Sequence, residues 1–214
     1  MSTTIYTSNG KILINGSNNK WLQKKDPFNP LGLDPRTVRV KIDVLGSNYQ
    51  PYIRTSGDQS KYTITVVDAE NGIYDVTSNK IQSGGYYINI GQGYADIEIG
   101  NPNNQNDAAT TYQFLGINAT GFTQMNFASM GGNQGYGLAG QIPIFDVSTL
   151  TTAGYMFTYN KKVTGGIIDT YNRLVALGDQ ITNHSQCFSS CGASTVTGAA
   201  ELAQIPSDWG GTAA

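Results

Sequence analysis

The feature that most constrains the fold of this chain is a unit of mixed periodicity, IPIFDVSTLTTAGYMFTYN, at residues 142–160. Apolar side chains stand at Ile144, Phe145, Val147 and Leu150, and after a polar run they return at 155–157. This spacing follows neither the period of a helix nor that of a strand. The pattern predicts a short strand, a turn and a short helical turn, folded into one repeat of a solenoid.

Two further stretches match this unit when an apolar residue followed by threonine is taken as the anchor. The anchors are Phe122-Thr123, Leu150-Thr151 and Ile181-Thr182, at separations of 28 and 31 residues. A phenylalanine stands seven positions after the second and third anchors, at Phe157 and Phe188. A unit of this length cannot bury its apolar edge alone, so we expect the units to stack on one another.

The middle unit resembles a known repeat family. FDVSTLTTAGYMF, residues 145–157, is similar to the F-D-T-S-x-V-T-x-M-x-x-M-F unit of the BspA-like leucine-rich repeats. LGINATGFTQM (115–125) resembles the unit that opens such arrays, and CFSSC (187–191) resembles its M-F-x-x-C end. The chain departs from the pattern at Ala153 and His184, where the family has Met. The resemblance implies a short leucine-rich-repeat solenoid.

A second resemblance lies at the N-terminus. YTSNGKILINGSNNKWLQ and DPFNPLGLDPRTVRVK, residues 6–23 and 26–41, resemble the leader of proteins encoded by tailed phages of gut Bacteroidetes, the crAss-like phages among them. In those proteins the leader precedes BspA-like repeats. This likeness is a family-level analogy and implies a virion protein.

Four segments follow from the patterning. Residues 1–36, punctuated by proline, are expected to be an arm or docking leader, with a small hairpin around KILIN between Asn9-Gly10 and Asn15-Gly16. Residues 37–100 are expected to form an antiparallel β-sandwich-like domain, since strands such as TVRVKIDV alternate apolar and polar residues. Residues 101–110 are expected to be a linker. Residues 111–214 are expected to form the repeat domain.

The C-terminal part of the chain carries the helical signals. IIDTYNRLVALGDQ, residues 167–180, has an apolar stripe at helical spacing and predicts a helix. A second short helix ends before Pro206, and Trp209 is available as a terminal plug. The predicted fold class is therefore mixed β/α: a β-sandwich-like domain followed by a solenoid with a C-terminal helical cap.

Composition excludes several classes of partner. The net charge is −2 and only 13 % of the 214 residues are charged, so nothing favours nucleic acid or an anionic membrane. No apolar run is long enough for a membrane span, and MSTTIYTSNG has no signal-peptide pattern. We therefore expect synthesis in the host cytoplasm.

The residues that could carry chemistry are few. His184, Cys187 and Cys191, with Asp179, could supply zinc ligands, but the two cysteines fall on core positions of the repeat, where a disulfide is the other alternative. Asp96 and Glu98 share one strand face and could form a glycosidase pair. No G-x-S-x-G, P-loop or H-E-x-x-H motif occurs. We expect no enzymatic activity, cofactor or metal.

Aromatic residues are the candidates for binding. Tyr6, Trp21 and Phe28 lie in an arm that cannot bury itself, and we expect either a partner or the chain's own β-domain to order them. Tyr136 and Tyr159 are candidates for stacking on sugar rings, whereas Tyr155 is expected in the core.

The sequence favours a phage virion structural protein, a head-fibre or capsid-decorating protein that displays an adhesive repeat domain. Its partners would be other virion proteins and surface glycans, and by analogy it would be a homo-oligomer, with a trimer as the first guess. The alternative is a bacterial cell-surface or secreted BspA-like adhesin that binds host or mucus glycans.

Overall fold

The computed structural model describes residues 5–8, 11–15, 21–23, 26–43, 48–54, 59–93, 95–104, 110–129 and 136–213. For the three N-terminal segments it describes the backbone alone. Two parts of the predicted segments lie outside the described residues: Val44 of the predicted strand 37–44, and residues 105–109 of the predicted linker.

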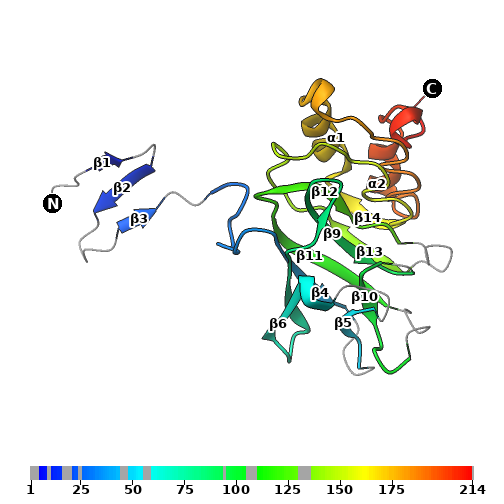
Figure 1. Cartoon of the computed structure of the whole chain (residues 1–214). Helices are drawn as coiled ribbons and strands as arrows, with labels where there is room; N and C mark the ends of the chain where they lie inside the picture. Colours follow the sequence, from blue (N-terminus) through cyan, green and yellow to red (C-terminus); the bar gives the residue numbers. More distant parts are fainter. Residues whose placement is uncertain are drawn as a thin grey trace.

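The N-terminal segments form a three-stranded antiparallel sheet. Its strands, in the order β1-β2-β3, are Ile5–Ser8 (β1), Lys11–Asn15 (β2) and Trp21–Gln23 (β3). The predicted hairpin around KILIN is confirmed, because β1 and β2 pair across Asn9-Gly10. In Figure 1 this sheet, drawn in blue, stands apart from the rest of the chain.

The largest sheet has six strands, in the order β14-β13-β11-β4-β7-β6. Their bounds are Lys162–Gly165 (β14), Gly137–Gln141 (β13), Thr111–Asn118 (β11), Thr37–Ile42 (β4), Ile73–Ser78 (β7) and Tyr62–Asp68 (β6). The alternation predicted for β4 is confirmed where it is described, since Val38, Val40 and Ile42 are all buried.

A second sheet has five strands, in the order β12-β9-β10-β5, with β8 also paired to β9. Their bounds are Phe122–Asn126 (β12), Gly85–Gly91 (β9), Ile97–Gly100 (β10), Gln50–Ile53 (β5) and Ile81–Gln82 (β8). Apolar side chains of both sheets belong to one buried cluster, which also contains the buried side chains of the C-terminal region. The two sheets and that region therefore share a core.

The sheets are mixed, so the predicted antiparallel sandwich is wrong. Four strand pairs are parallel: β9 with β10, β9 with β12, β11 with β13, and β13 with β14. β11 pairs antiparallel with β4, and Phe114 lies opposite Val40. Chain segments on both sides of residues 101–110 thus contribute strands to the same sheet.

The predicted leucine-rich-repeat solenoid with a helical cap is also wrong. Residues 115–125, expected as the first repeat, form the end of β11 and most of β12, which belong to different sheets. Residues 142–160 form turns and one isolated bridge, between Gln124 and Thr152. The physical reason is that alternating apolar residues in β11 and β12 pair with strands of the β-domain, whereas units of a solenoid contact only their neighbours.

The anchors of the three units are nevertheless adjacent in space. The backbone N–H of Thr151 donates to the carbonyl of Thr123 at 2.9 Å, and that of Thr182 donates to the carbonyl of Thr151 at 2.9 Å. Beneath them the rings of Phe114, Phe127, Phe157 and Phe188 form a continuous row. We call this row the aromatic row; it joins the sheets to the C-terminal coils.

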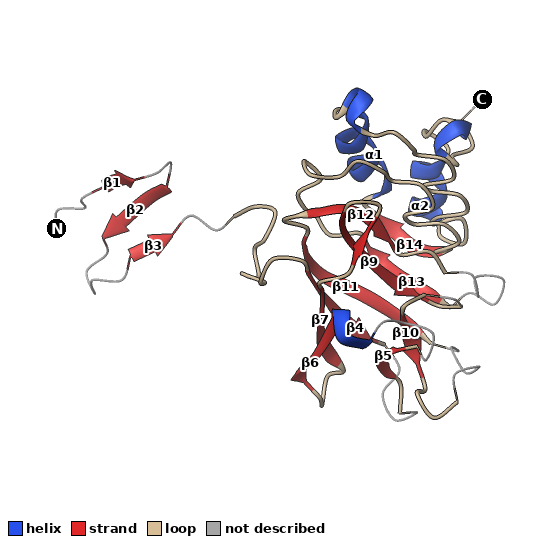
Figure 2. Cartoon of the chain, viewed as in Figure 1, coloured by secondary structure: helices blue, strands red, loops and turns tan. Residues whose placement is uncertain are grey.

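Two short helices lie at the end of the body near β12 and β14 (Figure 2). They are α1, Ile167–Val175, and α2, Val196–Leu202, and α2 packs against β14. The predicted helix over 167–180 is confirmed as far as Val175. The remaining short turns of 3-10 helix are Gln59–Lys61 (η1), Gly178–Gln180 (η3) and Ser207–Trp209 (η4).

The aromatic row makes Phe157 a test of this architecture. Phe157 is fully buried between Phe127 and Phe188, with ring centroids 5.6 Å and 5.9 Å away. We expect Phe157→Ala to reduce the free energy of unfolding by about 3–5 kcal/mol, because it removes a buried ring and leaves a cavity. Urea unfolding followed by circular dichroism measures the change. The matched control is Tyr155→Ala, at a side chain 46 % exposed, and a comparable loss in both variants would contradict the row's role.

Candidate functional site

A groove lies at the C-terminal end of the chain. It has a volume of about 380 Å³ and lies between α1, the turn that follows α1, and the segment 206–209. The lining residues are Tyr171, Val175, Gly178, Asp179, Ile181, His184, Pro206, Asp208 and Trp209. Its size falls within the range of about 300–1,000 Å³ that is usual for small-molecule sites.

One wall of the groove is built from three aromatic rings. The imidazole of His184 stacks on the indole of Trp209, with centroids 4.3 Å apart and an interplanar angle of 13°. The ring of Tyr171 meets the same indole edge-on, at 5.4 Å and 89°. Trp209 is only 7 % exposed, so its neighbours cover it, and the surface offered to a ligand belongs to His184 and Tyr171.

The charge of the groove is negative. The Asp208 carboxylate lies 3.3 Å from Nε2 of His184, whereas the Asp179 carboxylate is exposed and has no partner among the described residues. No lysine or arginine is among the lining residues. The groove can therefore accept hydrogen bonds and attract a positive charge, and it repels an anion.

Long-range contacts hold the groove in shape. The N-terminus of α1 follows Gly166, which has no side chain to cap the helix, and the carboxylate of Glu201 in α2 takes that role. Oε2 of Glu201 accepts from the backbone N–H groups of Ile167 and Ile168, at 2.7 Å and 3.1 Å. On the other side, the carbonyl of Trp209 accepts from the N–H of Phe188 at 2.9 Å, which fixes the C-terminal segment.

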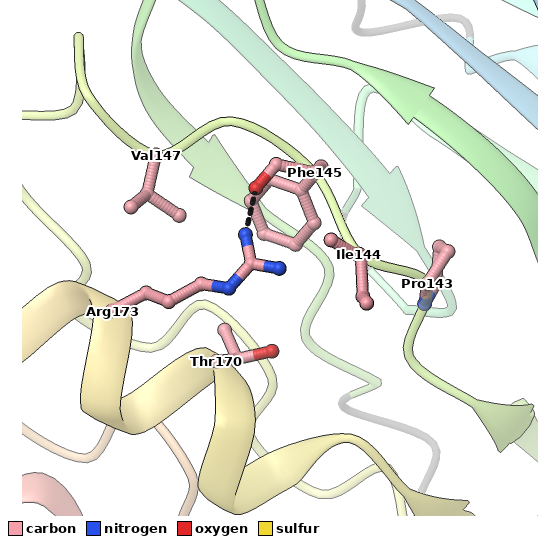
Figure 3. A pocket seen from close by; sticks show the side chains of 6 residues that line it. All are labelled: Pro143, Ile144, Phe145, Val147, Thr170 and Arg173. Carbon is pink, nitrogen blue, oxygen red and sulfur yellow. Dashed lines mark hydrogen bonds between the residues drawn. The ribbon is translucent and has the colours of Figure 1, made fainter. Parts of the chain in front are cut away.

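A second, smaller hollow lies between α1 and residues 143–147, and the side chain of Arg173 lines it. Figure 3 shows Arg173 of α1 reaching across this hollow to Phe145, whose carbonyl accepts from Nη1 at 2.6 Å. Arg173 also pairs with Asp169 at 3.2 Å, and its guanidinium lies 5.0 Å from the ring centroid of Phe28. Arg173 thus has its charged and polar partners within the chain. We interpret this hollow as a structural contact between α1 and the segments that carry Phe145 and Phe28.

The predicted docking residues fall into two groups. Phe28 contacts Arg173 of its own chain and keeps 38 % of its surface exposed, and the nearby carbonyl of Leu33 accepts from the Asn118 side chain at 2.6 Å. The segment from Phe28 to Leu33 is therefore held against the body. Tyr6 and Trp21 lie in β1 and β3, and their side chains are outside the described residues.

The predicted glycan contacts do not line the groove. Tyr159 is exposed on a turn, with φ of 62°, and its N–H donates to the carbonyl of Ser189 at 2.8 Å. Tyr136 is half-buried, and its carbonyl accepts from the hydroxyl of Ser129 at 3.4 Å. Tyr155, expected in the core, is exposed instead. The exposed pair Tyr155 and Tyr159 stays available to a ligand, separately from the groove.

Asp96 and Glu98 each have a cationic partner. Asp96 accepts from Lys80 and from the hydroxyl of Tyr62, both at 2.6 Å. Burial, together with that hydrogen bond, raises the pKa of Tyr62. Glu98 is buried and accepts from Tyr52 at 2.7 Å and Arg54 at 2.8 Å. These contacts account for both carboxylates as structural groups.

The predicted His-Cys-Cys cluster is split by the fold. Cys187 and Cys191 are free thiols in the core, while His184 faces the groove. Within the part of the chain that the structure describes, no group of three or more His, Cys, Asp or Glu side chains could hold a metal ion. Burial raises the pKa of both thiols.

The groove was missed at the level of sequence because its residues form no local motif. Tyr171, His184 and Trp209 come from three separate segments that packing brings together. The available signal was the single histidine of the chain and a tryptophan close to its end.

None of the described helices is both long enough and apolar enough to cross a membrane. Comparison of the chain with protein-family models, curated proteins and solved structures returned no match.

The buried thiols give a prediction about reactivity. Because Cys187 and Cys191 are fully buried and burial raises the pKa of each, both should stay protonated and inaccessible in the folded protein. Ellman's reagent should label neither cysteine under native conditions and both after denaturation. Rapid labelling of the folded chain would show that the C-terminal coils are open.

The contact from Glu201 gives a prediction about the groove wall. We expect Glu201→Ala to lower the free energy of unfolding by about 1–2 kcal/mol, since two N–H groups at the start of α1 lose their acceptor. Glu201→Gln keeps an acceptor oxygen without the charge and should cost less. Thermal unfolding of the two variants measures the difference, and equal stability of Glu201→Ala and the unaltered protein would refute the capping role.

Proposed function

We propose that this protein is a structural component of a tailed-phage virion, a head-fibre or capsid-decorating protein, whose body displays an adhesive surface. The observation that carries the proposal is the N-terminal sheet β1-β2-β3, which stands apart from the body in Figure 1. The resemblance of residues 6–41 to the leader of phage-encoded proteins supports the same role.

The N-terminal sheet has little apolar surface that it can bury within itself. Its strands have four, five and three residues, against a usual length of about five to six. The strand register places Ile5, Ile14 and Leu22 in one row across the sheet. We infer that another virion protein, a capsid or fibre component, provides the missing surface.

The body would then face outward. Its contacts with the N-terminal segment are made by Phe28 and Leu33, so the sheet can engage the particle while the C-terminal groove stays accessible. Weak binding of surface glycans at each copy would gain avidity from the many copies on one particle. A homo-oligomer, with a trimer as the first guess, would increase that avidity further.

A truncation separates attachment from folding. Deletion of residues 1–25 should leave thermal unfolding of the body nearly unchanged and abolish incorporation into particles, because the contacts with the body are made by Phe28 and Leu33, which this deletion keeps. The matched control, deletion of residues 1–36, also removes Phe28 and Leu33 and should lower the unfolding temperature.

Incorporation is measured by quantifying the protein on purified particles after infection of cells that supply each variant. Retention of the variant without residues 1–25 on particles would refute the attachment role. Absence of the full-length protein from particles, together with its presence on a bacterial surface, would favour the adhesin alternative.

A further inference from the structure

We propose that the groove lined by Tyr171, His184 and Asp179 binds an amino sugar, a hexosamine unit whose free amine carries a positive charge. The proposal rests on the adhesive role proposed above and names the class of ligand for it. It follows from the shape of the groove, its exposed rings and its charge.

The rings suit one face of a pyranose. The His184 side chain lines the groove and is 35 % exposed, while its imidazole is held by stacking on Trp209. Tyr171 lies beside it, and Val175, Ile181 and Pro206 extend the apolar surface. The C–H groups of a sugar ring pack well on such surfaces. Because Trp209 and Asp208 already hold His184, little side-chain freedom is lost on binding.

The carboxylates select the charge of the ligand. Asp179 and Asp208 each offer acceptor oxygens to sugar hydroxyl groups, and an ammonium group would form stronger, charge-assisted hydrogen bonds. An ammonium group close to the ring of Tyr171 also gains from its π face. With two carboxylates and no lysine or arginine in the lining, an acidic sugar would be disfavoured, because His184 is the one lining side chain that could offer it a positive charge.

The test is isothermal titration calorimetry of the unaltered full chain with three tetrasaccharides at low salt. The probes are a glucosamine oligomer, an N-acetylglucosamine oligomer and a galacturonate oligomer. They are cationic, neutral and anionic at about pH 6, which lies below the pKa of about 7.7–8.0 of an α-amino group, the closest analogue of the sugar amine. We expect the tightest binding for the glucosamine oligomer, weaker binding for the neutral one and none for the anionic one.

Two variants locate the effect. Asp179→Asn and Asp208→Asn should each weaken binding of the glucosamine oligomer by about two- to fivefold and reduce its preference over the neutral oligomer, because each exposed charge contributes modestly. The matched control is Asp34→Asn, at an exposed aspartate that does not line the groove. It should bind all three oligomers as the unaltered chain does.

Equal affinity for the cationic and neutral oligomers, preference for the anionic one, or no binding of any oligomer would overturn the proposal. So would equal losses in Asp34→Asn and the groove variants. These results concern the isolated protein, so they are independent of particle incorporation, which tests the virion role.

Discussion

The structure depends on the aromatic row that runs from the six-stranded sheet into the C-terminal coils. Phe114 of β11 meets Phe127 at 4.7 Å, and the row continues through Phe157 to Phe188, whose ring lies parallel to that of Phe157 within 9°. Beside it, backbone N–H groups of Phe127, Phe157 and Phe188 donate to carbonyls of the next coil, at 2.7–2.9 Å. The coils have little regular secondary structure, so burial of these rings and the accompanying hydrogen bonds must hold them.

The candidate binding site is a consequence of the same row. The last coil-to-coil bond ends on the carbonyl of Trp209, and the indole of Trp209 then positions His184 and Tyr171. A substitution in the aromatic row would therefore shift the residues that line the groove, although the substituted residue does not line it. At the other end of the chain, the N-terminal sheet stands apart from the body, so the proposed attachment and the proposed ligand binding would use separate surfaces (Figure 1).

Local sequence patterns predicted individual strands and helices correctly, but they could not predict which strands pair across the chain. The alternation of Val38, Val40 and Ile42 identified β4, and the apolar stripe from Ile167 identified α1. The separation of 31 residues between the second and third units also appears in the backbone, because Tyr155 and Gln186, which are 31 residues apart, both have positive φ. The solenoid was wrong because a repeat pattern shows that units adjoin but not that β11 and β12 pair with strands from the other half of the chain. The groove was unpredictable for a related reason: its three rings meet only once the coils have stacked.

We infer that residues 26–213 unfold as one cooperative unit and that the N-terminal sheet opens independently of it. Native-state hydrogen exchange in increasing denaturant can separate these two openings. We expect the amides of Phe157 and Phe188 to exchange through the same global opening as that of Val40 in β4, whereas amides of β1–β3 should exchange at much lower free energy. Exchange of Phe157 and Phe188 through a separate opening, well below that of Val40, would contradict this inference.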